Sequence, residues 1–260
     1  MFLLPQGSFY MRLCVKEIQQ FKNLIMQNKS KFILILYIIV GALQVTGILL
    51  KIPPLHQSLK VLLMPVLAFY LWNSIEEKSK NNLFLLSILA LAFSYSGDII
   101  LMIPGNNPLF FIGGLVSFLV AHLFYTKLFT TLSPLNKNIL KKNPIWIIAI
   151  ILFLIAFLSY LVPKIDTSLK IPVIAYGLII CTMLLSALHL KERIGKSPYK
   201  MIVAGAILFV LSDSILALNK FDPAFRGITF MHALVMITYI SAQGFIIHGI
   251  KKCSRQEHNV

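Results

Sequence analysis

The sequence predicts an all-α, polytopic integral membrane protein with eight transmembrane helices. Hydrophobic residues make up 58% of the 260 positions and charged residues 13%, whereas soluble domains are roughly half apolar and a quarter charged. The apolar residues form long continuous runs, most of them near the length with which a helix crosses about 30 Å of hydrocarbon. Because apolar and polar positions do not alternate within the runs, the pattern favours helices over a membrane β-barrel.

The first 30 residues precede the first apolar run and differ from it in composition. Cations are scattered among apolar positions there, and no small-residue cleavage site follows an apolar core, so the region does not resemble a signal peptide. Two interpretations stay open. Ile18, Phe21 and Ile25 could form one face of a short helix on the membrane surface, or the region could be an extension from an early start codon. We expect residues 1–30 to be a cytoplasmic or interfacial extension.

Eight apolar runs follow this extension. They lie at about residues 32–50, 58–72, 82–103, 108–130, 145–162, 171–190, 201–219 and 227–250. The second run is the shortest and contains Lys60 and Pro65, which predicts a tilted or kinked helix. We assign residues 31–250 to one eight-helix transmembrane domain and residues 251–260 to a cytoplasmic tail.

The distribution of positive charge predicts the orientation. Most of the 24 lysines and arginines lie in the amino-terminal region, in the connections near 73–81, 131–144 and 191–200, and in the tail. The connections on the opposite side carry only six: Lys51, Lys60, Lys164, Lys170, Lys220 and Arg226. Since cationic connections stay in the cytoplasm, both termini are expected there.

Composition also argues against several other classes of function. The net charge of +15 does not indicate nucleic-acid binding, because the cations sit in short connections where topology signals occur. Cys14, Cys181 and Cys253 are widely spaced, so neither a disulfide framework nor a zinc cluster is indicated. The six histidines form no metal-binding motif, which leaves zinc only through convergence of distant residues. We expect no metal and no cofactor.

Two aspartates within the apolar runs are the strongest functional signal. Of the nine acidic residues, only Asp98 and Asp213 fall well inside expected membrane segments, where an ionisable group is expensive and marks a functional site by default. Their surroundings, Ser-Gly-Asp-Ile-Ile-Leu and Ser-Asp-Ser-Ile-Leu, suggest a parallel four-helix internal repeat. In the expected orientation both carboxylates lie roughly 8 to 9 Å from the outer helix ends, at 1.5 Å per residue.

Two carboxylates close together in a low dielectric do not both ionise easily. Such a pair supplies one general acid and one carboxylate base or cation stabiliser, in an order that the sequence does not assign. The alternative is structural, with each carboxylate hydrogen-bonded to Ser, Tyr or Asn to tie helices together. The neighbouring Ser94, Ser96, Ser212 and Ser214 are interpreted as hydrogen-bond partners, since no nucleophile motif surrounds them.

Other polar side chains are candidates for the same cavity. Lys60 enters the second run from the outer side, where it could either extend its ammonium to the interface or pair with a phosphate head group. The remaining candidates lie inside the runs or at their outer ends, where each needs a polar partner: Tyr95, His122, Tyr125, Asn219, His232, Tyr239 and Gln243.

Several of these segments together resemble a known family. The segments are Ser96-Gly97-Asp98-Ile-Ile-Leu, His122-Leu-Phe-Tyr125, Leu211-Ser212-Asp213-Ser214-Ile-Leu-Ala217 and Tyr239-Ile-Ser-Ala-Gln243. In an eight-helix protein they resemble the lysoplasmalogenase family, which comprises the bacterial YhhN type and its eukaryotic transmembrane relatives. Leu59-Lys60-Val61-Leu-Leu-Met64-Pro65 resembles that family's Lys-Pro-x-x-Met-Pro stretch, with Val61 in place of proline. The resemblance covers about residues 30–250.

The resemblance implies a membrane hydrolase acting on lysophospholipid and water. Such an enzyme cleaves the vinyl ether bond of a lysoplasmalogen to a fatty aldehyde and glycerophosphoethanolamine or glycerophosphocholine. It implies Asp98 and Asp213 as the acid and base, Lys60 as the phosphate ligand, and Tyr95, His122, Tyr239 and Gln243 as positioning residues. Membrane lipid would surround the protein, in a bacterial inner membrane. The sequence indicates neither a head-group preference nor an oligomeric state.

Two other functions stay open from the residues alone. The carboxylate pair and the parallel repeat would also suit a proton-coupled transporter of a small molecule or lipid. A scaffold or lipid-binding protein, in which the aspartates only bridge helices, is the third interpretation. Release of aldehyde separates the hydrolase from both.

Overall fold

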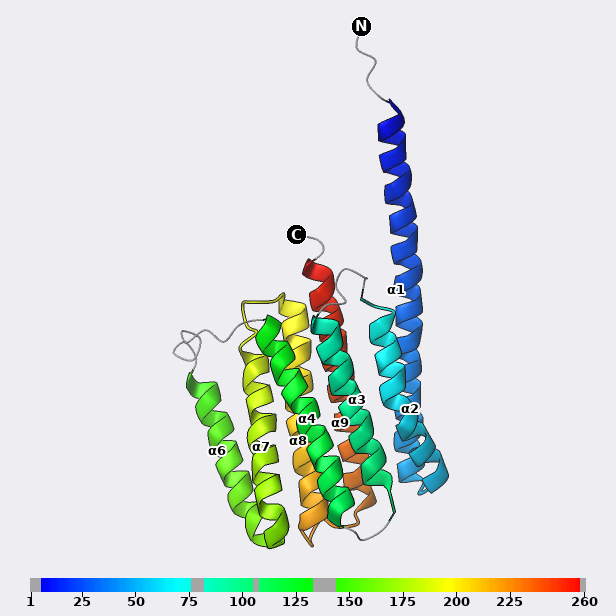
Figure 1. Cartoon of the computed structure of the whole chain (residues 1–260). Helices are drawn as coiled ribbons and strands as arrows, with labels where there is room; N and C mark the ends of the chain where they lie inside the picture. Colours follow the sequence, from blue (N-terminus) through cyan, green and yellow to red (C-terminus); the bar gives the residue numbers. More distant parts are fainter. Residues whose placement is uncertain (1–5, 76–81, 105–107, 133–143, 258–260) are drawn as a thin grey trace.

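The computed structural model describes residues 6–75, 82–104, 108–132 and 144–257. Within these residues the chain forms a bundle of long helices with no strand (Figure 1). The helices are α1 (Gln6–Leu49), α2 (Pro53–Trp72), α3 (Asn82–Met102), α4 (Pro108–Leu132), α6 (Pro144–Leu161), α7 (Thr167–Leu188), α8 (Lys196–Phe221) and α9 (Thr229–Glu257), with a short 3-10 helix η2 (Val162–Lys164) after α6.

The prediction of an all-helical protein with eight apolar spans is confirmed. Eight helices in the described part of the chain are long and apolar enough to cross a membrane. Several helices begin before the corresponding apolar run. The second begins at Pro53 because proline suits the first turn of a helix, where its missing N–H is not needed. The polar His56 and Gln57 in its first turns concealed this start from the hydropathy pattern.

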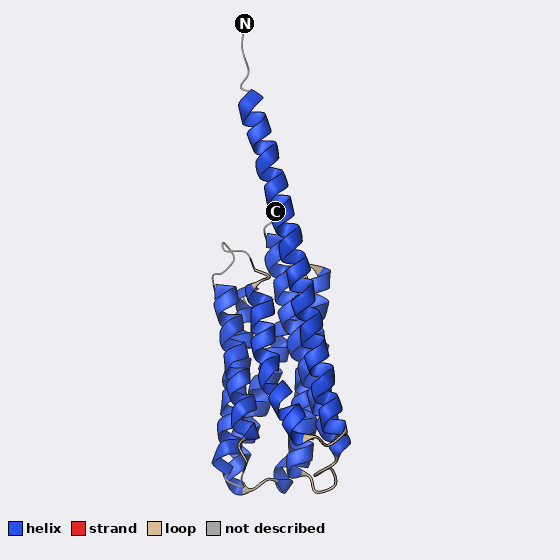
Figure 2. Ribbon diagram, turned by 90° about the vertical axis from the view of Figure 1, so that its right-hand side faces the viewer, coloured by secondary structure: helices blue, strands red, loops and turns tan. Residues whose placement is uncertain are grey.

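Helix α1 is longer than one membrane span. Residues 6–30 continue as its first part instead of forming a separate short helix, and α1 projects beyond the bundle (Figures 1 and 2). The start of α1 and the end of α9 lie at the same end of the bundle, called here the terminal end. The opposite end, called here the loop end, carries the connections from α1 to α2, from α3 to α4, from α6 to α7 and from α8 to α9.

Close helix contacts position the aspartates. Helix α3, with Asp98, packs along α4, and helix α8, with Asp213, packs along α9. At Gly205 of α8 an added Cβ would lie 2.8 Å from the backbone oxygen of Ala242 in α9, so the two backbones approach to a distance that only glycine permits. Helix α6 lies at the edge of the bundle, with most of its side chains facing outward.

Candidate active site

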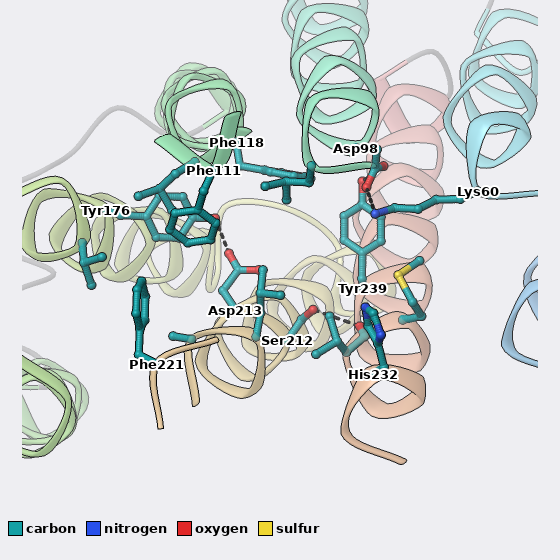
Figure 3. A pocket seen from close by; sticks show the side chains of 17 residues that line it. Lys60, Asp98, Phe111, Phe118, Tyr176, Ser212, Asp213, Phe221, His232 and Tyr239 are labelled. Carbon is teal, nitrogen blue, oxygen red and sulfur yellow. Dashed lines mark hydrogen bonds and ion pairs between the residues drawn. The ribbon is translucent and has the colours of Figure 1, made fainter. Parts of the chain in front are cut away.

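A cavity of about 90 Å³ lies among α2, α3, α4, α7, α8 and α9, toward the loop end. Its walls are mostly apolar, formed by side chains such as Phe111, Leu115 and Phe118. Both intramembrane aspartates line it, together with five other polar side chains (Figure 3): Lys60, Tyr176, Ser212, His232 and Tyr239. The cavity therefore brings polar groups from five helices to one apolar space.

Asp98 is held by a cation and a hydroxyl group. Its side chain is buried, with the Lys60 ammonium 3.1 Å from Oδ1 and the Tyr239 hydroxyl donating to Oδ2 at 2.8 Å. These groups come from α3, α2 and α9 (Figure 3). The ammonium and the donated hydrogen bond both favour the ionised form of the carboxyl group over the protonated form.

Asp213 has different partners on the other side of the cavity. The Tyr176 hydroxyl donates a short hydrogen bond to its Oδ2, and His122 Nε2 lies 3.3 Å from the same oxygen. His122 Nε2 also lies 2.9 Å from the Tyr176 hydroxyl, so the three groups form a closed triangle. Within the described residues, both interactions of this carboxyl group fall on Oδ2, which leaves Oδ1 available to the cavity.

A second layer of polar groups supports the Asp98 side. Gln243 is buried, accepts a 2.5 Å hydrogen bond from the Tyr125 hydroxyl, and donates to Ser94 Oγ at 2.9 Å. These bonds tie α9 to α4 and α3. Gln243 and Tyr125 are absent from the cavity wall, so they position α3 and α9 and do not contact its contents.

The serines beside the aspartates bond to main-chain groups or to Gln243. Ser212 Oγ donates to the backbone oxygen of Val235 in α9 at 3.0 Å, while Ser96 and Ser214 donate to carbonyls of their own helices. The sequence predicted these serines as hydrogen-bond partners of the neighbouring aspartates. Their partners, however, are not the aspartates within the described residues.

The structure places the remaining sequence candidates in three ways. Lys60, Tyr239 and His232 line the cavity, and His122 reaches it through Asp213. Asn219 lies in an adjoining cavity at the loop end. Tyr95 packs against the hydrophobic core and is absent from both cavity walls.

The geometry changes the expected role of Lys60. The sequence offered an ammonium at the membrane interface or a ligand for phosphate. Instead its side chain is only 17% exposed and forms an ion pair with Asp98. An ammonium that neutralises a buried carboxylate has little freedom left to follow a head group, so we no longer expect Lys60 to be the main phosphate ligand.

Sequence reasoning missed Tyr176 as a site residue. It lies in the segment Pro172-Val173-Ile174-Ala175-Tyr176, which echoes Pro65-Val66-Leu67-Ala68-Phe69 of the suggested repeat. The two segments differ at their last position, which is Phe69 in one and Tyr176 in the other. A hydroxyl group gained at an otherwise apolar position could have marked Tyr176 as a site residue. Among the described residues, no group of three or more His, Cys, Asp or Glu side chains is arranged to hold a metal ion.

Comparison with known proteins then places the chain in a family. The model of the YhhN family matches residues 55–250, which include the aspartates and the polar groups bonded to them. The chain belongs to the YhhN family. Its relatives include lysoplasmalogenase TMEM86B of Homo sapiens, 33% identical over 154 residues, which are 59% of this chain and 58% of that protein.

Lysoplasmalogenase TMEM86B of Rattus norvegicus is 34% identical to this YhhN-family protein over 154 residues, 59% of the chain and 56% of the relative. The matched region thus spans less than two thirds of either relative. No solved structure matches the chain.

Proposed function

We propose that this YhhN-family protein hydrolyses the vinyl ether bond of lysoplasmalogens, using Asp213 as the general acid and Asp98 as the ionised carboxylate. One observation carries the proposal. A buried aspartate and a partly buried one, each with different partners, line one largely apolar cavity, which can supply an acid and a carboxylate charge together. The similarity to proteins named lysoplasmalogenase supports the choice of substrate.

The first step is proton transfer to carbon. Asp213 Oδ1 gives its proton to the β-carbon of the vinyl ether, and the π electrons form the new C–H bond. The positive charge that results is shared between the other vinyl carbon and the ether oxygen as an oxocarbenium ion. Tyr176 and His122 then stabilise the new Asp213 carboxylate through Oδ2.

The second step is addition of water. The Asp98 carboxylate stabilises the oxocarbenium ion electrostatically, as the carboxylates of glycosidases do. Water attacks the carbon of this ion, and Asp213 takes back the proton that the water loses. The hemiacetal then breaks its C–O bond to the glycerol as its hydroxyl proton passes to the glycerol oxygen, giving a fatty aldehyde and a glycerophospho compound. The cycle consumes one water and needs neither a metal nor a covalent intermediate.

The assignment of roles follows from the hydrogen bonds. Lys60 and Tyr239 favour the charged form of Asp98 and oppose the effect of its burial, so we assign this residue the role of the ionised carboxylate. Asp213 lacks a lysine partner among the described residues, and its free Oδ1 can carry a proton toward the cavity. The apolar walls strengthen both charge effects by keeping bulk water out.

Aldehyde release by detergent-purified protein tests the proposal. The substrates are lysoplasmenylethanolamine and lysoplasmenylcholine, and the variants are Asp98→Asn and Asp213→Asn. We expect each variant to lose about 10²- to 10⁴-fold in kcat, which is the usual contribution of a general acid or base. Ser96→Ala is the matched control, because this exposed hydroxyl near Asp98 bonds only its own helix.

A second readout tests the chemistry itself. In D₂O, protonation of the β-carbon places one deuterium on the carbon next to the aldehyde group. Aldehyde without that deuterium would rule out this mechanism. Folded wild-type protein that releases no aldehyde from either substrate would exclude the hydrolase for these lipids, and proton-coupled transport would be the next assay.

A further inference from the structure

A second cavity adjoins the proposed active site at the loop end. It has a volume of about 420 Å³ and is formed by the end of α1, the start of α2, the end of α8 and the start of α9. His232 lines both cavities, so the second one adjoins the first along the α9 side. A molecule lying across His232 would occupy both.

The polar side chains of this second cavity are suited to an anion. They comprise one ammonium, two imidazoles, one amide and one hydroxyl, from Lys51, His56, His232, Asn219 and Thr229. No carboxylate lines the cavity. Every one of these groups can donate a hydrogen bond, and phosphate offers oxygen acceptors only.

The backbone adds to this positive character. Helix α9 begins at Thr229 in the cavity wall, and the first N–H groups of a helix have no partner within the helix. The helix dipole makes the same end favourable for an anion.

Two local features of this cavity favour a bound ligand. The side-chain Oδ1 of Asn219 is buried and has no hydrogen-bond partner among the described residues. The amide oxygen and nitrogen of Asn are assigned by their hydrogen bonds, so this position can equally present its NH₂ to a ligand. A buried amide oxygen without a partner is costly, and a ligand group that reached it would remove the cost.

Lys51 is the second feature. It lies two residues after the end of α1 and has φ 54°, and the Ile52 N–H donates to the Gly47 carbonyl at 2.9 Å, which is the pattern of a helix end that glycine usually occupies. Lysine is less favourable than glycine in this left-handed conformation. Lysine at this position therefore carries a conformational cost, and a ligand for its ammonium would offset that cost.

We propose that this second cavity binds the phosphate of the lysophospholipid head group, with Lys51, His56, His232 and Asn219 as its ligands. This inference rests on the proposed function for the identity of the lipid. The three-carbon glycerol would pass His232, and the vinyl ether would lie between Asp98 and Asp213. The alkenyl chain then continues along the apolar wall at Phe111 and Phe118.

Lys51→Gly is the decisive variant, because it removes the ammonium and relieves the backbone at the same time. Glu192→Gly is its matched control, since Glu192 has φ 69° and lies at the terminal end. The assay compares lysoplasmenylethanolamine with the phosphate-free 1-alkenylglycerol. For Lys51→Gly we expect KM to rise about tenfold for the phospholipid, the loss of one charge-assisted contact. Its kcat, and its kinetics on alkenylglycerol, should not change.

Direct binding separates this inference from the proposed function. Glycerophosphoethanolamine should raise the thermal midpoint of the wild type and of Glu192→Gly, and raise that of Lys51→Gly much less. If this pattern appears but no substrate yields aldehyde, the phosphate site stands and the hydrolase fails. If aldehyde is released but Lys51→Gly has the wild-type KM for the phospholipid, the phosphate site is wrong. Inorganic phosphate that stabilises as well as glycerophosphoethanolamine would overturn a lipid head group as the occupant.

Discussion

Removal of the Tyr176 hydroxyl group tests the proposed role of Asp213 as the general acid. Its hydrogen bond to Asp213 Oδ2 strengthens as the carboxyl group loses its proton, because a donor to a charged acceptor is stronger than one to a neutral acceptor. Tyr176→Phe removes that donor and leaves the ring. We expect kcat for aldehyde release to fall about 10- to 100-fold, as for loss of one charge-assisted hydrogen bond of about 1.5 to 3 kcal/mol.

Tyr95→Phe is the matched control for this substitution. Tyr95 lies on the same helix as Asp98 but packs against the core outside the cavity. It should keep wild-type kcat and KM. Equal losses in the two variants would show that Tyr176 acts through general packing and would remove it from the proposed mechanism.

The ion pair between Lys60 and Asp98 allows a second prediction from single residues. Lys60→Met leaves a buried carboxylate without its cation, so the variant should lose activity and about 1 to 3 kcal/mol of stability, less than a fully buried pair because Lys60 is 17% exposed. Thermal unfolding in detergent measures the loss. The double variant Lys60→Met/Asp98→Asn should recover most of the stability and none of the activity.

At this scale the sequence predicted which residues carry charge but not how they pair. Asp98 and Asp213 stand out because a carboxylate in an apolar run is costly. Tyr239 and Tyr95 looked equivalent, yet only Tyr239 faces the cavity. A helix in lipid is apolar all round, so it lacks the polar stripe that reveals the inward face of a soluble helix. The rotation of α3, and with it the position of Tyr95, was therefore not predictable.

The contact between α8 and α9 gives a prediction at the scale of elements. Gly205→Ala would place a Cβ 2.8 Å from the Ala242 oxygen and 3.0 Å from the Ile246 nitrogen, both backbone atoms that cannot rotate away. The two helices must separate, at a cost of about 1 to 3 kcal/mol. Gly113→Ala is the control, because its nearest neighbour would lie at 3.4 Å, in ordinary contact. The thermal midpoint should fall for Gly205→Ala alone.

Asp222 links the outer helix α6 to the connection between α8 and α9. Its Oδ2 accepts hydrogen bonds from Lys164 and Tyr160, each at 2.5 Å, and its Oδ1 accepts one from the Ala224 N–H at 3.0 Å. The Lys164 ammonium first, then the Tyr160 hydroxyl and the Ala224 N–H, lower the pKa of Asp222 to about 2.

This lowered pKa predicts a pH dependence. An aspartate has a pKa of about 3.9 in an unfolded chain, so the carboxylate of Asp222 stabilises the fold fully above that pH. The contribution is lost as the pH falls from about 4 through the folded pKa of about 2. Asp222→Asn should lower the thermal midpoint at pH 7. The difference in thermal midpoint between the variant and wild type should become smaller below about pH 4.

Asp166→Asn is the control for Asp222. Asp166 lies at the same end of the molecule, is exposed, and makes no capping bond to α7. The thermal midpoint of Asp166→Asn should equal that of wild type at pH 7 and at pH 3. A difference between Asp222→Asn and wild type that stays constant from pH 7 to pH 3 would show that the charge of Asp222 is not the stabilising feature.

The number and order of the helices were predictable because each apolar run is continuous and near one membrane thickness. The residues at which the helices begin and end were less predictable. Residues 6–30 and the start of α2 are helical although they contain polar side chains. Outside the apolar layer a helix is decided by local propensity and capping, which hydropathy does not report.

The two ends of the bundle differ in function in this proposal. The terminal end holds the start of α1 and the end of α9, and both cavities lie toward the loop end. The excess of Lys and Arg in the connections at the terminal end predicts that this end faces the cytoplasm. The proposed phosphate site would then open to the opposite side, and its substrate would come from the outer leaflet. The two ends can be compared through two exposed arginines: Arg193 in the connection from α7 to α8, and Arg226 in the connection from α8 to α9 at the loop end.

Thiol labelling of intact cells measures this orientation. In a chain whose three cysteines are replaced by serine, Arg226→Cys should react with a membrane-impermeant maleimide before permeabilisation, and Arg193→Cys only after it. Each substitution removes one arginine, so the difference in cation count between the two ends changes by only one in either case. The reverse labelling pattern would place both cavities on the cytoplasmic side. The lysophospholipid would then come from the inner leaflet, and the arrangement of charges in the connections would not have set the topology.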